Sequence, residues 1–387
     1  MSTVARRPPG TEPRRSSSRG DAANSWINVA LHWITRWEVG LCLLIVIVIA
    51  GSSAASSNFL TPFNLETMAL NATVLGFLAL GVAPVIMTGD IDLSIASTLA
   101  LCGVVMAVLW QHGMNIWVAA GLAIILGGIL GLVNGLVVVM FELPSLAVTL
   151  GSMSTYTGIA FLILQGKAII NFPASLVQLG SGGLFGSDFP IASAILLICA
   201  AILAFVIHRT AFGKSVFAIG GNRQAARFSG VPVARTRILV FVIAGAFAAL
   251  AAIFYLGNFD TAQANMAADQ LLPAITAVIL GGVSAYGGSG TIQGVVLALV
   301  LLQVLETGLG VAGLSGQEQT ISVGILLIIA ISGGAAIGAV RNRFRRREHR
   351  SSIALPATSE TEEVSQTASI NVDEDHSTHE QGYKSVP

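Results

Sequence analysis

The chain has 387 residues, of which 54% are hydrophobic and 10% charged, and its 20 basic and 20 acidic side chains give a formal net charge of zero. Soluble domains average about 25% charged residues. The deficit is concentrated in the middle of the chain, because residues 38–340 contain only 17 of the charges. So few charges cannot cover a water-exposed surface of that size, which excludes a soluble fold and predicts contact with membrane lipid. The zero net charge gives no general attraction to nucleic acid.

Ten long apolar runs dominate the sequence. A helix that crosses about 30 Å of hydrocarbon needs roughly 20 mostly apolar residues, and runs of that length favour helices over a β-barrel. We therefore predict an all-α, polytopic membrane protein with about ten transmembrane helices within residues 38–340. In chain order the predicted spans are 38–56, 68–87, 92–110, 116–140, 145–165, 191–208, 237–256, 271–286, 291–310 and 319–340.

The distribution of Lys and Arg predicts the orientation of these spans. Basic residues near membrane-spanning helices accumulate on the cytoplasmic side. With ten helices and a cytoplasmic N-terminus, both tails and the connections after the second, fourth, sixth and eighth spans are cytoplasmic. These segments hold 19 of the 20 Lys and Arg residues, and only Lys167 lies elsewhere. The sequence thus predicts a multi-pass protein with both termini in the cytoplasm.

The two tails differ from the membrane region in composition. Residues 1–37 are rich in Arg, Ser and Pro, and we predict a largely disordered basic tail because so few apolar residues cannot form a core. Residues 341–387 begin with an Arg-rich segment that directly follows the last span. We predict that this segment anchors the span and attracts anionic lipid, and that the acidic remainder is disordered.

The connection after the sixth span, residues 209–237, combines six basic residues with apolar ones. Asn222 is a suitable N-cap for a short helix from Arg223 to Ser229, which Gly230 would end. One interpretation is a compact helical knob that contacts a cytoplasmic partner. The other is a basic cytoplasmic loop without a partner, for which the positive charges alone suffice.

A second landmark is the sequence MTGDIDLSIAS, Met87–Ser97, at the junction of two spans. An ionised carboxylate in a membrane needs a partner or a wet cavity, and this segment has two carboxylates, those of Asp90 and Asp92. Asp92 is a candidate N-cap for the third span, and the same turn is a candidate lining of a polar translocation path. Polar residues within the spans can bind backbone carbonyls and neighbouring helices, or face a polyhydroxylated solute. The path candidates are Asp90, Asp92, Ser94, Asn134, Thr149, Gln303 and Glu306.

Catalytic and cofactor motifs are not apparent in the sequence. Phe212–Ser215 reads FGKS, but the glycine that should open a phosphate-binding loop is His208 and no strand precedes it. Neither a metal-type His/Glu pair on a helix nor a Ser/His/Asp set in a polar setting stands out. Three isolated cysteines lie inside apolar runs, where we expect them to act as small hydrophobic residues: Cys42, Cys102 and Cys199. We expect no enzyme activity, metal or cofactor.

At four blocks the chain resembles the permease subunits of bacterial ABC importers for sugars, of the ribose, xylose, arabinose and galactose type. The resemblance covers approximately residues 38–340. The blocks are VIMTGDIDLSIAS (Val85–Ser97), the stretch that begins FELPSLAVTLG (Phe141–Ile169), the stretch FGKSVFAIGGNRQAARFSGVP with its continuation (Phe212–Gly245), and a weaker pair, Ala277–Gly282 and Gly287–Gly290.

The resemblance implies a ten-helix importer fold in the bacterial cytoplasmic membrane, in which two permeases, identical or paralogous, form one path. ATP hydrolysis would take place in a separate cytoplasmic ATPase. An extracytoplasmic sugar-binding protein would dock on the external loops 57–67, 166–190 and 257–270. The connection 209–237 would be the coupling loop, and its ATPase-contacting residues would be Gly220, Gly221, Asn222, Arg223, Ala226, Arg227, Ser229 and Gly230.

Two departures from the family pattern and three alternatives remain. Asp90 and Ala96 stand where the family block has glycine, and the resulting acidic pair is similar to the rhamnose-type and furanosyl-autoinducer-type branches, some of which use two different permeases.

One alternative function is that of a permease for branched-chain amino acids, although the spans supply few charges for that solute. Another is an ion-coupled secondary transporter with Asp90, Asp92 or Glu306 as its cation site. An integral-membrane enzyme is disfavoured by the missing nucleophile and metal sets.

Overall fold

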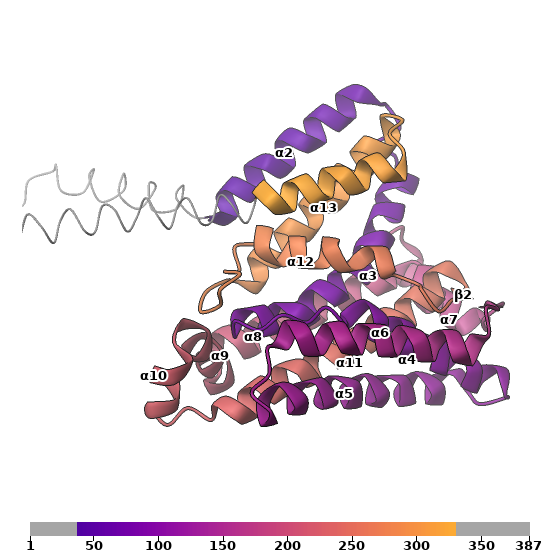
Figure 1. The fold of residues 1–387 in the computed structure, drawn as a ribbon. Helices are drawn as coiled ribbons and strands as arrows, with labels where there is room; N and C mark the ends of the chain where they lie inside the picture. Colours follow the sequence, from indigo (N-terminus) through magenta and orange to yellow (C-terminus); the bar gives the residue numbers. More distant parts are fainter. Residues whose placement is uncertain (1–36, 330–387) are drawn as a thin grey trace, which may run out of the picture. The chain divides into compact units, whose positions relative to one another are not determined.

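The structure, a computed structural model, describes residues 37–329. In this part the chain is almost entirely helical, and helices that are far apart in the sequence lie side by side (Figure 1). The predictions for the basic tail that ends at residue 37 fall outside the described residues apart from Trp37. Those for the segment 341–387 fall outside them entirely.

Each predicted span contains an apolar helix, which confirms the all-α polytopic prediction. Seven helices of the described part are long and apolar enough to cross a membrane, and three apolar helices are shorter. In chain order they are α2 (Trp37–Ala55), α3 (Pro62–Met87), α4 (Ile95–Gln111), α5 (Ile116–Met140), α6 (Ser145–Leu164), α8 (Ile191–Arg209), α11 (Val233–Phe259), α12 (Leu271–Leu280), α13 (Ile292–Val311) and the helix Gly316–Ile329, beyond which the chain is outside the described part.

Three predicted boundaries are wrong. α3 begins at Pro62, six residues before the predicted start at residue 68. α12 stops at Leu280 and not at residue 286, because the glycines that follow adopt positive φ angles, 86° at Gly282 and 84° at Gly287, that a helix does not contain. α4 begins at Ile95 with Ser94 as its N-cap, so Asp92 does not cap this helix. Sequence analysis also missed several short elements: β1 (Ile169–Ile170), α7 (Ala174–Ser181), η1 (Leu184–Gly186), α9 (Ala211–Gly221), β2 (Thr261–Ala262) and η2 (Ala268–Gln270).

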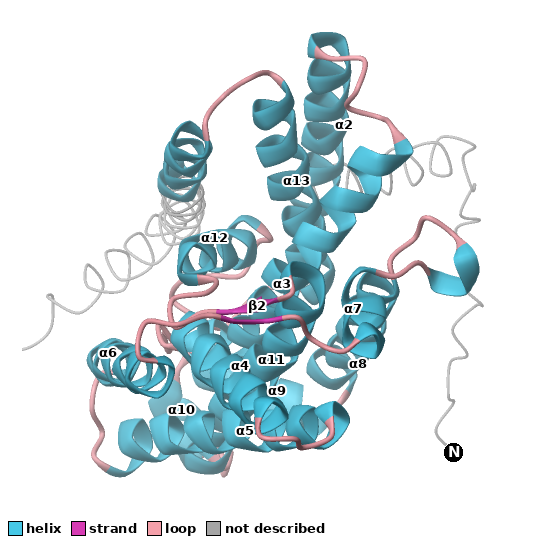
Figure 2. Ribbon diagram, turned by 90° about the vertical axis from the view of Figure 1, so that its right-hand side faces the viewer, coloured by secondary structure: helices cyan, strands magenta, loops and turns pink. Residues whose placement is uncertain are grey.

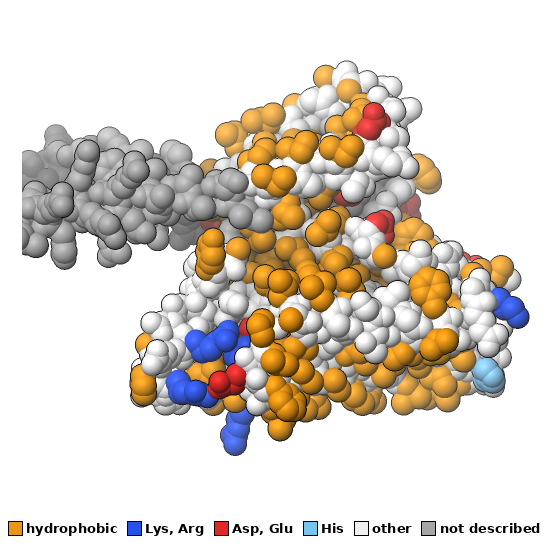
Figure 3. All heavy atoms as spheres, in the orientation of Figure 1, with side chains coloured by type: hydrophobic (Ala, Val, Ile, Leu, Met, Phe, Trp, Pro, Cys, Tyr) orange, Lys and Arg blue, Asp and Glu red, His pale blue; other side chains and the backbone are white. Residues whose placement is uncertain are grey.

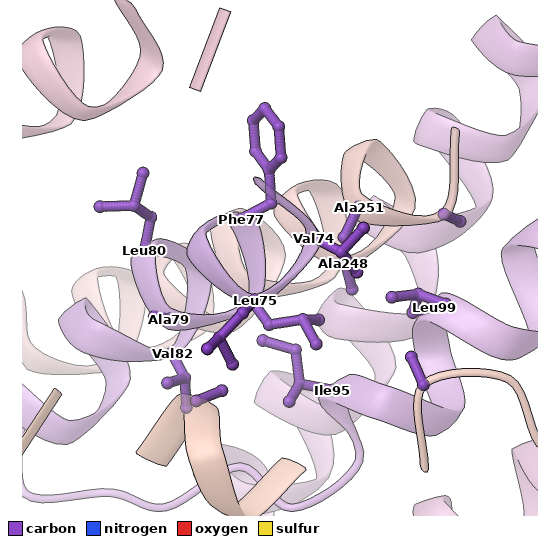
Figure 4. Packing of buried hydrophobic residues seen from close by; sticks show 14 of the residues in the cluster. Val74, Leu75, Phe77, Ala79, Leu80, Val82, Ile95, Leu99, Ala248 and Ala251 are labelled. Carbon is purple, nitrogen blue, oxygen red and sulfur yellow. The ribbon is translucent and has the colours of Figure 1, made fainter. Parts of the chain in front are cut away.

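The central packing unit consists of α3, α4 and α11. The second half of α3, from Val74 to Met87, is buried at every position, so this half of the helix lies inside the bundle. Leu75 from α3, Leu99 from α4 and Ala248 from α11 belong to the same apolar cluster (Figure 4). A helix that is apolar on all sides is expected in such a buried place.

Glycines allow α5 and α11 to pack closely. Gly127, Gly131 and Gly135 repeat every fourth residue and therefore lie on one face of α5. A Cβ atom at Gly131 would lie 2.1 Å from the carbonyl oxygen of Phe241 in α11. The two helix backbones can approach this closely only because the glycine face carries no side chains.

The connections that follow the second, fourth, sixth and eighth predicted spans, after α3, α5, α8 and α12, meet at one end of the described part. The amide of Gly288, after α12, donates a hydrogen bond of 2.9 Å to the carbonyl oxygen of Met87 at the end of α3. Arg227, between α8 and α11, lies 4.0 Å from Glu142, between α5 and α6. Most of the Lys and Arg side chains visible in Figure 3 lie at this end, beside α9. The contacts agree with the alternation that the basic residues predicted.

The connections that follow the fifth and seventh predicted spans, after α6 and α11, meet at the other end. β1, after α6, pairs in antiparallel fashion with β2, after α11, in the register Ile169 to Ala262 (Figure 2). The amide of Phe172 donates a hydrogen bond of 2.7 Å to the Asp260 carboxylate, and the Phe172 ring lies 5.1 Å from that of Trp110 at the end of α4. Two of the predicted external loops, 166–190 and 257–270, are therefore joined.

Replacing Gly131 by Ala should destabilise the protein, because the new methyl group overlaps the backbone of α11. We expect the free energy of unfolding to fall by about 1–3 kcal/mol, the usual cost of overpacking. Gly128→Ala is the matched control, since its Cβ atom would have Val242 Cγ1 at 3.9 Å as its nearest neighbour. An SDS titration of the detergent-solubilised variants measures the difference, and equal stability of the two variants would contradict the close packing.

Candidate functional site

The predicted coupling loop, residues 209–237 and called the coupling loop below, is a folded unit. It consists of α9, the short helix α10 (Arg223–Phe228) and the first turns of α11. Ile219, Ala226 and Val233, one from each helix, form a small apolar cluster apart from the main core. The spacing of the buried residues Gly213, Val216 and Ile219 is the signal that sequence analysis could have used to predict α9.

α10 confirms the predicted short helix. The Asn222 side chain accepts a hydrogen bond of 2.9 Å from the amide of Ala225 at the N-terminus, and Gly230 follows the helix with a φ angle of 79°. Ala226 faces inward, whereas Arg227 is 72% exposed and Phe228 is 82% exposed. α10 therefore presents a cation and an aromatic ring on its outer side.

A backbone contact holds the coupling loop against the bundle. A Cβ atom at Gly220, near the end of α9, would lie 2.0 Å from the carbonyl oxygen of Met87 and 2.3 Å from the amide nitrogen of Gly288. A Cβ atom at Gly221 would meet nothing within 4 Å. Of these two glycines of α9, Gly220 is therefore the one that must lack a side chain for α9 to reach the ends of α3 and α12.

Asp90 forms the central ion pair of this region. Its carboxylate accepts hydrogen bonds from Arg237 Nε at 2.7 Å and from Arg237 Nη2 at 2.8 Å. Arg223 Nη2 adds a third contact at 3.3 Å, and Thr88 Oγ1 a fourth at 3.4 Å. Asp90 is 3% exposed and Arg237 is 6% exposed, so the pair is shielded from water. The expectation that this carboxylate needs a partner is therefore met by Arg237.

A cavity of about 420 Å³ lies beside this ion pair. Three arginines, Arg223, Arg227 and Arg237, line it together with Glu142. The apolar side chains of its wall include Val139 from α5. The cavity therefore borders both the exposed Arg227 and the buried Arg237.

Asp92 belongs to a separate polar network. It accepts hydrogen bonds from the amide of Ser94 at 2.8 Å and from its hydroxyl at 2.6 Å. The Ser94 hydroxyl oxygen in turn accepts a bond of 2.8 Å from Asn134 Nδ2 on α5. Asn134 Oδ1 accepts bonds from Ser152 at 2.6 Å and from Tyr156 at 3.3 Å, both on α6. This network links the start of α4 to the facing sides of α5 and α6.

An open groove of about 470 Å³ runs along α5 and α6 next to this network. Most of the residues that line it are apolar, and Asn134, Ser152, Thr155 and Tyr156 supply its neutral hydrogen-bonding groups. Thr149 lies next to them and donates a hydrogen bond of 3.3 Å to the carbonyl oxygen of Ile91. Sequence analysis named Asn134 and Thr149 as path candidates but did not include Ser152 and Tyr156, which only the α5–α6 contact brings to Asn134.

Two of the predicted path residues lie elsewhere. Gln303 donates a hydrogen bond of 3.3 Å to Thr307 in its own helix, α13. Glu306 lines a different cavity of about 320 Å³ together with Asp269 and Gln319. The structure thus gathers five of the seven candidates around the segment between α3 and α4 and leaves these two on α13.

The fold and the comparisons together define the class of protein. The model of the family described as "Branched-chain amino acid transport system / permease component" matches residues 64–331, and the chain belongs to this family. It is a multi-pass membrane permease. Permeases of this class work in ABC importers with a separate ATPase and a solute-binding protein.

Particular relatives are similar along most of the chain. The Autoinducer 2 import system permease protein LsrD of Photorhabdus luminescens is 35% identical over 303 residues, which cover 77% of this chain and 90% of that protein. The protein of the same name from Yersinia enterocolitica is 34% identical over 303 residues, covering 77% of this chain and 91% of that protein. No solved structure gave a significant match.

Replacing Arg237 by Gln should leave the buried Asp90 carboxylate without its bidentate partner. We expect the free energy of unfolding to fall by about 3 kcal/mol, the lower end of the usual cost for breaking a buried pair, because Arg223 still contacts the carboxylate. Arg227→Gln removes the same charge from an exposed pair 4.0 Å apart and should cause no measurable change. SDS titration of both variants provides the measurement, and equal losses would contradict the buried pair.

Proposed function

We propose that the chain forms half of the translocation path of an ATP-driven importer for a monosaccharide or a similar small polyhydroxylated solute. In this proposal α10 is the helix that docks on the cytoplasmic ATPase. The observation that carries the proposal is the coupling loop itself, which has its own apolar core and a backbone contact with the bundle while Arg227 and Phe228 face outward. A loop whose only role was to supply positive charge would not need this structure.

The proposed orientation places the α9–α10 end in the cytoplasm. The basic residues Arg209, Lys214, Arg223, Arg227 and Arg235 belong to this end, in keeping with the positive-inside rule. The joined loops 166–190 and 257–270 then lie outside the cell, where the solute-binding protein would dock. Both termini are cytoplasmic in this arrangement.

The groove along α5 and α6 is the proposed path. Its polar groups are uncharged side chains, and neutral donors and acceptors suit the hydroxyl groups of a sugar-like solute. The groove is open on one side, and a second permease, either a copy of this chain or a paralogue, would enclose it. The similarity to autoinducer 2 permeases supports a small, hydroxyl-rich solute and makes autoinducer 2 one candidate.

Uptake into cells that contain the permease, its ATPase and its binding protein tests the solute class. We expect radiolabelled autoinducer 2, pentoses and hexoses to compete with one another for uptake. We expect leucine not to compete with them. Leucine uptake would favour the amino-acid alternative that the family description names. Uptake that survives an inactivated ATPase but collapses with an uncoupler would favour a secondary transporter instead.

The outer side of α10 should be required for ATPase binding. Phe228→Asp with Arg227→Glu reverses the chemistry of this side without touching the buried Ala226, so we expect the membrane-inserted protein to lose its ATPase in a pull-down. Phe185→Asp is the control, because Phe185 is 99% exposed but lies between α7 and α8, away from α10. Undiminished ATPase binding by the α10 variant would count against the docking role.

A bulky side chain in the groove should block uptake. Thr155 is exposed on α6 and lines the groove, so Thr155→Trp fills part of its volume. We expect uptake to be lost while ATPase binding is kept. Ile129→Trp, at an exposed position of α5 outside the groove, should leave both properties unchanged. Normal uptake by Thr155→Trp would place the path elsewhere.

A further inference from the structure

The segment between α3 and α4 is irregular and yet buried. Asp90 and Asp92 are each 3% exposed, and Ser94 is fully buried. Irregular backbone inside a membrane protein is tolerated only where its polar groups find partners. Here the amide of Ile91 donates a hydrogen bond of 3.0 Å to the hydroxyl oxygen of Ser145, the first residue of α6. The segment is therefore fixed in place by specific contacts.

One side of this segment is held by the coupling loop. Asp90 binds Arg223, the first residue of α10, and Arg237, in the second turn of α11. The Asp90–Arg237 contact is bidentate, which fixes the relative orientation of the two groups as well as their distance. A displacement of α10 or of the start of α11 must therefore either move Asp90 or break these bonds.

The other side of the segment is bound to the groove helices. Ile91 is hydrogen-bonded to Ser145 and Thr149 of α6. The next residue, Asp92, holds the Ser94 hydroxyl that accepts the bond from Asn134 of α5. Five consecutive residues, 90–94, thus connect α10 and α11 to both helices of the groove.

We propose that Asp90 is a positioning residue that transmits the movement of the ATPase-docked coupling loop to the α5–α6 groove. This inference rests on the proposed function and adds the residue that links its two sites, the docking helix α10 and the α5–α6 groove. Asp90 does this without touching solute, because its carboxylate is shielded from water and bound by two arginines. Coupling between distant sites requires an element that both sites bias, and the segment 90–94 contacts both.

The test measures how ATP changes the accessibility of the groove. The permease carries Cys42→Ala, Cys102→Ala and Cys199→Ala, together with Thr155→Cys, at an exposed position of α6 that lines the groove. It is reconstituted in nanodiscs with its ATPase and binding protein, and the rate of labelling by a membrane-impermeant maleimide is compared with and without ATP and vanadate. With Asp90 and Arg237 intact, we expect ATP and vanadate to change the labelling rate.

The variant Asp90→Asn with Arg237→Gln removes both charges together and so avoids an unpaired buried charge. We expect it to insert, to retain the ATPase and to lose the effect of ATP on labelling. Arg235→Gln is the matched control, since Arg235 is exposed on the same helix, and should keep the effect.

Two outcomes for the double neutral variant would overturn the inference. It could keep the full ATP effect, or it could lose the ATPase itself. The inference would also be overturned if the permease with Asp90 and Arg237 intact bound the ATPase but showed no effect of ATP on labelling. Failure of the proposed function is distinguishable from all of these, because the unmodified protein would then not bind the ATPase at all.

Discussion

The contact between Asp90 and Arg237 is the interaction on which the rest of the site depends. A carboxylate and a guanidinium group lie inside an apolar bundle, where each alone would be costly. Their bidentate geometry offsets that cost and also joins residues 147 positions apart. Because Arg223 binds the same carboxylate, the short helix α10 is tied to the end of α3 through one side chain. The buried carboxylate of Asp90 is therefore one of the contacts that position this loop.

Glycines provide the second constraint. Gly220 allows α9 to contact the backbone at Met87 and Gly288, and Gly131 allows α5 to pack against α11. Both contacts join backbones rather than side chains, so they depend little on side-chain rotamers and much on the absence of a Cβ atom. In a membrane, where apolar side chains gain little by leaving lipid, such close packing is a main source of helix association. The same residue type thus serves the bundle and the coupling loop.

In the proposed importer, charged and neutral polar residues have separate places. Arg223, Arg237 and Asp90 lie at the α9–α10 end, whereas Asn134, Ser152 and Thr155 line the groove. A hydroxyl-rich solute would meet neutral groups there, and the charged groups would serve the contact with the ATPase. The network from Asp92 to Asn134 lies between these two regions and borders both.

The sequence by itself determined the apolar spans, their alternation and the short helix after Asn222, because each depends on local composition, on the spacing of residues or on the charges near a span. It also placed five path candidates that the structure brings together. It could not show that Arg237 is the partner of Asp90, that Ser152 and Tyr156 meet Asn134, or that Glu306 lies in a different cavity. These facts depend on which helices are neighbours, and apolar helices in a membrane carry little sequence signal for their neighbours. Only the tertiary packing, set by glycine faces and by one buried ion pair, decided them.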